Sequence, residues 1–443
     1  MSISKTGFFF PRIPERLLLN VIAVFSVVVG LLNTALAWVI YGAGGKADIW
    51  MLSFVVAQAF VLLSQLGVEQ YAVFSAEHAT VSEQAGKSFD RQCLSWSLMF
   101  GTGFAGLLAV FLPSIVGMFA AGFSAAAQAE VLHTVYPLLL QVALAPMLYV
   151  LRQQLLMQGR AKLSILLNST FSMVQLLVLA GGWVSGQLSP AILATLVGLG
   201  SLLAATSALF SSGPLRDQFA RPDWYRLWPF IRASAALRFT HSIHNFLVVL
   251  LTNSALSGGV PGTVSLFQYV KKIADGISSV AIGPHLQVYH AAQAGAWARS
   301  DKRLFHKNIR EYLLHALPVI AIALAGILVC WRFAGDFIPS LAHKATTEAF
   351  WIFVVLSTWQ VLISVESVPA GVLVVGKHTR WLLLVNALFV MNFYLMMHVA
   401  ISAPYSAATV ATMSLLCQCI SSTIISFLAL MFYRKKFEGV NRA

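Results

Sequence analysis

Four polar residues share one face of a segment that is otherwise mostly apolar. Ser234, Arg238, His241 and Asn245 are spaced +4, +3 and +4, which is the repeat of one α-helical face. A charge at membrane depth costs roughly 2.5–3.5 kcal/mol on insertion scales, so such residues normally face a protein interior or a water-filled cavity. The spacing predicts one wall of a cationic cavity. Arg238 and His241 are the best candidates for binding an anion, because no acid lies at helical spacing from them.

A second charged group, Lys271, Lys272 and Asp275, follows in the next apolar segment. Lys271 and Asp275 are four residues apart and can pair with each other, which leaves Lys272 over. Arginine binds phosphate through planar bidentate hydrogen bonds, and lysine binds it as a point charge. We expect these cations to extend the same wall, with protonation of His241 or of an acid tuning the affinity for an anion.

Other apolar segments carry amides and single charges at helical spacing. Cations outnumber acids among these buried positions, and the amides are many, so the cavity suits a ligand with both phosphate and hydroxyl groups. The alternatives are interhelical hydrogen bonds for the amides, and, for the charges, ion pairs or side chains that reach the membrane surface. The candidate substrate-binding residues are Arg238, His241, Asn245, Lys271, Lys272, Arg152, Gln58 and Gln65, and the acids that are candidates for coupling to H⁺ or Na⁺ are Glu69, Asp275 and Glu366.

The elements that carry these residues are predicted to be membrane-spanning helices. The chain has 443 residues, of which 58% are hydrophobic and only 10% charged, too few charges to cover a soluble protein of this size. Apolar runs of the length that spans a bilayer recur throughout, and the first is too long for a cleavable signal peptide. The fold class is therefore an all-α polytopic membrane protein with twelve spans, at about 17–41, 50–74, 94–119, 131–157, 163–185, 189–210, 233–255, 263–289, 312–334, 347–373, 380–402 and 406–432.

The connections between these spans differ sharply in positive charge. Of the 29 Lys and Arg residues, 22 fall on one side of the predicted membrane and only Lys46, Arg332 and Lys344 on the other. Positive connections stay in the cytoplasm, so both termini are predicted to be cytoplasmic. The formal charge of +13 is then a topology signal that also attracts anionic lipid, and we expect no nucleic-acid partner.

The chain divides near its middle into two similar halves. The connection at 211–230 contains Pro222, Pro229 and several aromatics, which predicts an interfacial linker between an N-terminal lobe at 1–210 and a C-terminal lobe at 231–443. Gly159 and Asn168 in the first half correspond in spacing and helix position to Gly376 and Asn386 in the second. Two lobes with an even number of spans each share their orientation, an arrangement in which transporters bind substrate between the halves.

Signs of enzyme chemistry are weak in this chain. Cys417 and Cys419 form a Cys-x-Cys inside an apolar segment without a nearby His or acid, so we expect no metal site there. We find no glycine-rich phosphate loop and no nucleophile–base pair. A membrane polysaccharide polymerase or acyltransferase is therefore a less favoured alternative. A multidrug exporter of organic cations is another, although acids should dominate its cavity.

Three short motifs resemble known transporters. Residues 66–77, which contain Gly67 and Gln70, resemble the Gly-x-x-Gln segment of polysaccharide flippases, and the turns around Gly159 and Gly376 resemble turns of the same group. This is the polysaccharide transport branch of the multidrug/oligosaccharidyl-lipid/polysaccharide (MOP) superfamily, which includes O-antigen and lipid II flippases.

The resemblance implies a V-shaped fold of two six-helix lobes and a cationic cavity formed here by Arg238, Lys271 and Lys272. It implies flipping of an undecaprenyl-pyrophosphate-linked oligosaccharide across the bacterial inner membrane, without covalent chemistry or a cofactor. A polymerase and a chain-length regulator of the same pathway are the protein partners to expect. The fuller lipid II flippase pattern and two further C-terminal helices are absent from the sequence, which favours an O-antigen or exopolysaccharide repeat over lipid II.

Overall fold

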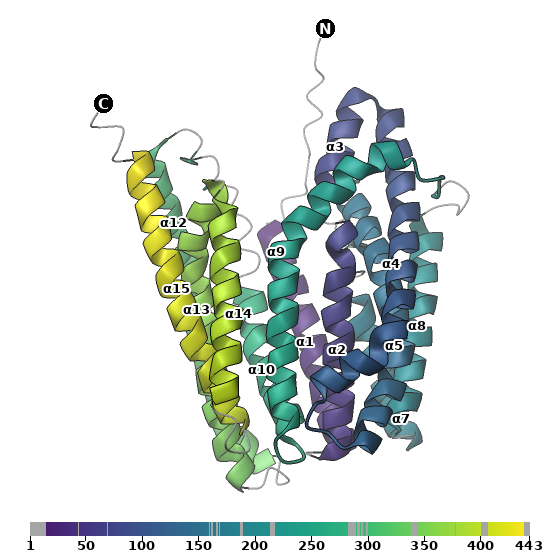
Figure 1. Ribbon diagram of the computed structural model, residues 1–443, viewed down its shortest axis with the longest axis vertical. Coiled ribbons are helices and arrows are strands. Elements are labelled where there is room, and N and C mark those ends of the chain that lie inside the picture. The colour runs from purple at the N-terminus through teal and green to yellow at the C-terminus, as the bar shows by residue number, and fades with distance from the viewer. Residues whose placement is uncertain are drawn as a thin grey trace.

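The protein is described here from a computed structural model, and its ordered elements are all helical (Figure 1). The structure describes residues 15–42, 44–68, 70–158, 160, 163–164, 167, 169–186, 189–212, 218–281, 289, 293, 296–297, 300–337, 343–376, 378–399 and 406–437. No strand occurs among these residues. The prediction of an all-α protein is therefore confirmed.

The helices follow the predicted spans closely. They are α1 (Glu15–Tyr41), α2 (Gly45–Ser64), the 3₁₀ turn η1 (Gln65–Gly67), α3 (Tyr71–Val81), α4 (Glu83–Phe119), α5 (Ala125–Met157), α7 (Thr170–Ser185), α8 (Pro190–Ser212), α9 (Trp224–Ser257), α10 (Thr263–Ala281), α12 (Lys302–Phe337), α13 (His343–Val375), α14 (Thr379–Val399) and α15 (Ala407–Phe437). Each predicted span overlaps one of them. Within the described residues, seven helices are both long and apolar enough to cross a membrane, and the protein is a multi-pass membrane protein.

The second predicted span, 50–74, is wrong in its extent, because the helix breaks near its end. Helix α2 stops at Ser64, η1 follows, and α3 starts separately at Tyr71. The break lies where the chain packs closely on α4: a Cβ on Gly67 would lie 3.1 Å from the ring of Phe100. The indole Nε1 of Trp96 donates a hydrogen bond to the carbonyl oxygen of Gly67 at 3.1 Å. A backbone carbonyl leaves the helical pattern here and finds its partner on α4.

Helix α9 begins inside the segment predicted to be an interfacial linker. The side chain of Asp223 caps it by accepting a hydrogen bond from the backbone N–H of Tyr225 at 3.1 Å, as N-cap residues do. Trp224, Tyr225 and Trp228 are exposed on this first part of the helix, which suits the headgroup level of a bilayer. The division of the chain into lobes at this segment stays a prediction.

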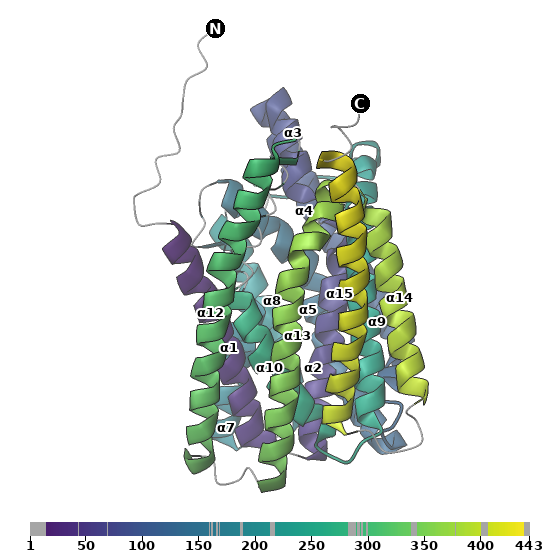
Figure 2. The same cartoon turned by 90° about the vertical axis from the view of Figure 1, so that its left-hand side faces the viewer.

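The helices form two groups that approach each other at one end and diverge at the other (Figure 1). Figure 2 shows that α3 and the last turn of α15 lie at the same end of the molecule. One group contains α12 to α15, the other contains α2, α4, α5, α7 and α8, and helices α1, α9 and α10 lie between them. We call the end formed by residues 42, 44–45, 120–125 and 258–262 the narrow end, and the end that carries α3 and the last turn of α15 the wide end.

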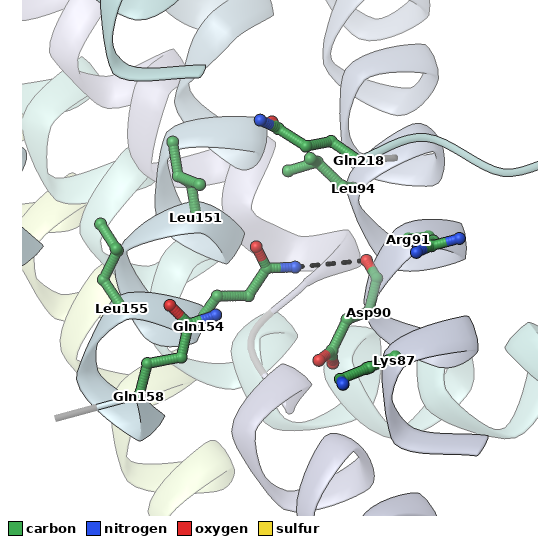
Figure 3. Close-up of a pocket in the computed structure, with 9 residues that line it drawn as sticks. All are labelled: Lys87, Asp90, Arg91, Leu94, Leu151, Gln154, Leu155, Gln158 and Gln218. Atoms are coloured by element: carbon green, nitrogen blue, oxygen red, sulfur yellow. Dashed lines mark hydrogen bonds between the residues drawn. The ribbon is translucent and has the colours of Figure 1, made fainter. Parts of the chain in front are cut away.

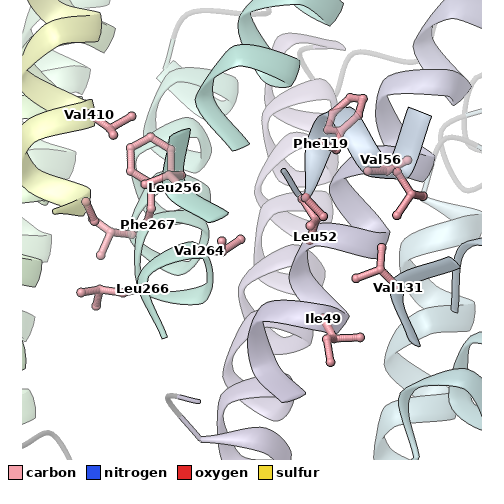
Figure 4. Close-up of a cluster of buried hydrophobic side chains, with 14 of the residues drawn as sticks. Ile49, Leu52, Val56, Phe119, Val131, Leu256, Val264, Leu266, Phe267 and Val410 are labelled. Atoms are coloured by element: carbon pink, nitrogen blue, oxygen red, sulfur yellow. The ribbon is translucent and has the colours of Figure 1, made fainter. Parts of the chain in front are cut away.

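A single hydrophobic core joins both groups. It includes Leu52 of α2, Phe119 of α4, Phe267 of α10, Phe353 of α13 and Val410 of α15, all buried. Figure 4 shows part of it, with side chains of α10 and α15 opposite those of α2. Because lipid is as apolar as these side chains, close packing rather than escape from water holds such helices together. The groups are thus fixed to each other through α10.

Candidate functional site

Helix α10 carries a charged face in its middle. The Lys271 Nζ and a carboxylate oxygen of Asp275 form the ion pair that the sequence spacing predicted, and this prediction is confirmed. Gln360 of α13 donates a hydrogen bond from Nε2 to the other carboxylate oxygen at 2.7 Å. The two charged side chains are 31% and 39% exposed. The pair is therefore partly exposed and is bonded to α13.

Lys272 is the cation that this pair leaves over. Its side chain is partly buried, and among the described residues it takes part in no ion pair or hydrogen bond. Lys271 and Asp275 cancel each other's charge, so the face carries a net positive charge through Lys272. An uncompensated, partly buried cation is costly, and an anionic ligand would relieve that cost.

On the N-terminal side, α2 exposes the face that the sequence picked out. Gln58 and Leu62 are exposed and Gln65 is partly buried, whereas Val56 and Phe60 are buried in the core. The amides thus lie on the less buried side of the helix. Glu69, the candidate acid that follows them, lies outside the described residues.

The polar face of α9 is divided between two roles. Ser234 is fully buried and accepts a hydrogen bond from the backbone N–H of Gln70 at 3.0 Å, which attaches α9 to the segment after α2. Asn245 is exposed. The helix positions of Arg238 and His241 are described but their side chains lie outside the described part of the structure, so the anion-binding role stays a prediction for both.

His244 of α9 packs against a neighbouring helix. Its ring Nδ1 lies 3.2 Å from the carbonyl oxygen of Asn386 on α14. The ring also packs edge-on against Phe389, with 5.1 Å between centroids. This histidine therefore joins α9 to α14.

Two further candidates lie in surroundings of their own. Arg152 sits over the ring of Tyr149 on the same helix, α5, with 5.4 Å between the guanidinium carbon and the ring centroid, a cation–π contact. Glu366 lies on a different side of α13 from Gln360 and contacts α15. It accepts hydrogen bonds from Gln418 Nε2 at 2.5 Å and from the hydroxyl of Ser422. The structure does not bring Glu366 together with Asp275.

The sequence reasoning missed Asp48, at the narrow end. This carboxylate on α2 is 3% exposed and accepts hydrogen bonds from the backbone N–H groups of Gly262 at 2.6 Å and Ser265 at 2.7 Å. It thereby caps the first turn of α10, where a negative charge is favoured by the helix dipole. An acid in the first turn of an apolar helix was the only signal in the sequence.

A backbone contact closes the narrow end beside Asp48. The hydroxyl of Ser257 accepts a hydrogen bond from the N–H of Gly122 at 2.9 Å. A Cβ on Gly122 would lie 2.3 Å from the Cα of Gly258, so the turn after α4 and the turn after α9 touch backbone to backbone. Only glycine permits so close an approach. These contacts hold the two turns together at the narrow end.

No protein-family model matches the sequence, and no curated protein sequence matches it. Solved structures do. The lipid II flippase MurJ in an inward closed conformation is similar with a TM-score of 0.74 and 13% identity, over 95% of this chain and 90% of that chain. An inward-facing multidrug resistance MATE family transporter of the MOP superfamily is similar with a TM-score of 0.72 and 13% identity, over 95% of this chain and 99% of that chain. MATE in a straight conformation is similar with a TM-score of 0.58 and 15% identity, over 96% of each chain.

The chain shares the fold of these MurJ and MATE structures. At sequence identities this low, the similarity shows a shared fold and not a shared activity. The function must therefore be inferred from the site itself. The resemblance inferred from the short motifs agrees with this architecture over almost the whole chain.

Proposed function

We propose that the protein is a flippase that moves an undecaprenyl-pyrophosphate-linked oligosaccharide across the bacterial inner membrane by alternating access. The observation that carries the proposal is Lys272, which lies on the helix between the two groups and takes part in no ion pair among the described residues, since Asp275 pairs with Lys271. The pyrophosphate would supply that counterion, with Arg238 as a second cation. The exposed amides Gln58 and Asn245 would bind sugar hydroxyl groups.

The helix arrangement supports movement between two states. The narrow end is closed by Asp48 and by the Gly122–Gly258 contact, whereas the helix groups diverge at the wide end (Figure 1). A substrate would enter from the wide end, and the lobes would then rock to part the narrow end. The connections that are rich in Lys and Arg are expected to stay in the cytoplasm. They support a cytoplasmic wide end, with export toward the outer leaflet.

A multidrug exporter of organic cations is the second candidate, because MATE transporters share the fold. Such a protein needs an acid available to its ligand. Of the candidate acids that the structure describes, Asp275 is bonded to Lys271 and Gln360, and Glu366 to Gln418 and Ser422. The charge balance thus favours an anionic ligand.

The test is reconstitution of the purified chain into proteoliposomes. Vesicles would carry the lipid-linked oligosaccharide in one leaflet, and its appearance in the other would be measured by lectin binding. We expect flipping far above protein-free vesicles, and its loss in Arg238→Glu at equal protein content. A chain that exports ethidium but does not accelerate flipping would overturn the proposal in favour of the exporter. Full flipping by Arg238→Glu would remove that residue from the site.

A further inference from the structure

A second site lies at the wide end of the group that contains α4 and α5, away from the charged face of α10. It is a cavity of about 190 Å³ between the first turns of α4 and the last turns of α5 (Figure 3). Its lining is Lys87, Asp90, Arg91, Leu94, Leu151, Gln154, Leu155, Gln158 and Gln218. Nothing in the proposed transport cycle uses this cavity.

The lining changes from charged to apolar along the helices. Lys87 and Arg91 are four residues apart on α4, so they share a face, and both are exposed. Leu94, Leu151 and Leu155 form a buried floor. The change falls where the apolar run of α4 begins, which is the depth at which lipid headgroups meet acyl chains.

Aromatic side chains mark the same depth. Trp224 and Tyr225 are exposed at the start of α9, and the ring of Trp224 packs edge-on against Trp96 of α4 at 5.2 Å. Exposed tryptophan and tyrosine concentrate at the level of the headgroups. Trp96 is one helical turn or so beyond Arg91, so the cavity opens at that level.

The charges in the cavity leave its cations available. Asp90 also lines the cavity, but one of its carboxylate oxygens already accepts hydrogen bonds from Tyr71 at 2.5 Å and Ser75 at 2.6 Å, both on α3. Lys87 pairs with Glu83 at 2.6 Å, but these side chains are 66% and 84% exposed, so water and salt screen the pair. Arg91 forms no ion pair among the described residues.

We propose that this cavity binds the phosphodiester headgroup of a membrane glycerophospholipid. Arg91 and Lys87 would bind the phosphate, as basic pockets between membrane helices on the cytoplasmic side do. Gln154 and Gln158, also four residues apart, would bond the glycerol oxygens, and the leucine floor would receive the first carbons of the acyl chains. The proposal is independent of the transported substrate.

The bound lipid would lie against the connection between α8 and α9. Gln218 belongs to that connection and donates a hydrogen bond to the carbonyl oxygen of Leu209 at 2.7 Å. Two residues on, the N–H of Ala220 donates to the hydroxyl of Ser95 on α4 at 3.1 Å. A lipid in the cavity therefore contacts α4, α5 and this connection together, and would stabilise the attachment of the connection to α4.

The experiment measures lipid binding to the purified full-length chain in a nonionic detergent. The probes are short-chain phosphatidylglycerol, short-chain phosphatidylcholine and inorganic phosphate, each titrated against thermal unfolding and native mass spectra. The test variant is the double substitution Lys87→Gln/Arg91→Gln. The matched control is Arg303→Gln/Lys307→Gln, because these cations have the same spacing on α12, and Lys307 likewise pairs with a nearby exposed acid, Glu311, at 3.7 Å.

We expect saturable binding of phosphatidylglycerol that is at least tenfold weaker in the test variant and unchanged in the control. Equal weakening in both double variants would overturn the proposal, because the cations would then act only through general charge. Equal stabilisation by inorganic phosphate at the same concentration would overturn the assignment to a lipid. If the test variant binds phosphatidylcholine as tightly as the natural chain does, the two cations do not bind the phosphate of the headgroup, and the proposal fails.

A charge-preserving variant distinguishes loss of the cations from misfolding of the chain. Lys87→Arg/Arg91→Lys keeps both cations, and we expect its affinity for phosphatidylglycerol to stay within about threefold of the natural chain. If it elutes as a monodisperse protein and yet loses binding as fully as the Gln variant, the cations are not the binding groups and the proposal fails.

Discussion

Helix α10 has two polar regions that differ in how completely their charges are neutralised. At its first turn, the carboxylate of Asp48 is buried and bonded by two backbone N–H groups. About two turns later, Lys271 and Asp275 pair in a partly exposed setting, and Lys272 beside them has no ion-pair partner in the described structure. The first region is a buried contact between α2 and the start of α10, and the second is partly exposed.

The difference separates a structural contact from a binding site. A buried acid whose oxygens are all directed at fixed donors stabilises one arrangement of helices and has little capacity for a ligand. A surplus cation next to an ion pair gains most from an incoming anion. Mutations in the first region should therefore shift the equilibrium between conformations, whereas mutations in the second should change binding of substrate.

The largest effect is expected for Lys272→Glu, which reverses the surplus charge. Loss of a charge-assisted contact costs about 2–3 kcal/mol, so the flipping rate at low substrate should fall roughly 30- to 150-fold. The rate is measured in proteoliposomes at matched protein content. Lys272→Arg keeps the charge and should retain most of the activity. A Glu variant as active as the natural chain would show that the charged face of α10 does not bind the substrate.

A smaller effect, on conformation, is expected for Asp48→Asn. The amide can accept from only one of the two backbone donors well, so the closed narrow end should lose about 1–3 kcal/mol. The measurement is electron–electron distance spectroscopy between spin labels at Ala126 and Val260, in a background without native cysteines. A population at longer distance should appear.

The matched control for this variant is Asp301→Asn. Asp301 also caps a helix, accepting from the N–H of Leu304 at 2.9 Å, but it is exposed at the start of α12 and contacts no other helix group through that bond. Its variant should leave the distance distribution unchanged. If Asp48→Asn also leaves it unchanged, the contact with α10 does not hold the narrow end closed.

Glu366→Gln should have a moderate effect that concerns ion coupling only. Glutamine has the same shape and can still bond Gln418 and Ser422, so the fold should persist, while an ion coupled through the carboxylate would be lost. We expect a drop of about threefold to tenfold in the flipping rate and a flatter response to pH or Na⁺. Glu311→Gln, at an exposed position on α12, is the control. An unaltered pH and Na⁺ response would exclude Glu366 from coupling.

The smallest effect is expected at the wide end, for His378 in the turn between α13 and α14. Partial burial, then the nearby Arg380 and Lys435, lower the pKa of this histidine from its usual value of about 6.5. The fold thus favours the neutral ring. Its contribution to stability is present above pH 6.5 and is lost as pH falls from there through the lowered pKa.

The corresponding measurement is the melting temperature of the purified chain between pH 7.5 and 5.5. We expect the decline due to this group to be less than about 2 °C and to be absent in His378→Phe, which keeps the stacking on Phe432 at 3.7 Å. A steeper decline in the Phe variant would contradict the assignment.

The sequence was informative wherever an interaction depends on neighbours along one helix. The Lys271–Asp275 pair followed from i,i+4 spacing alone, and the fold class followed from recurring apolar runs. The sequence did not predict the end of a helix where that end depends on a contact with a distant segment. The predicted span at 50–74 ends early because Gly67 packs against α4, and periodicity carries no information about that contact.

Local spacing and hydropathy therefore determined the helices, the charged face of α10 and the surplus of Lys272. Only the tertiary structure decided that Asp48 caps α10 across 214 residues of sequence, and that Glu366 is bonded to α15 rather than to Asp275. The physical reason is that helix geometry fixes which side chains share a face, whereas the partner of that face is set by packing between helices that are remote in the chain.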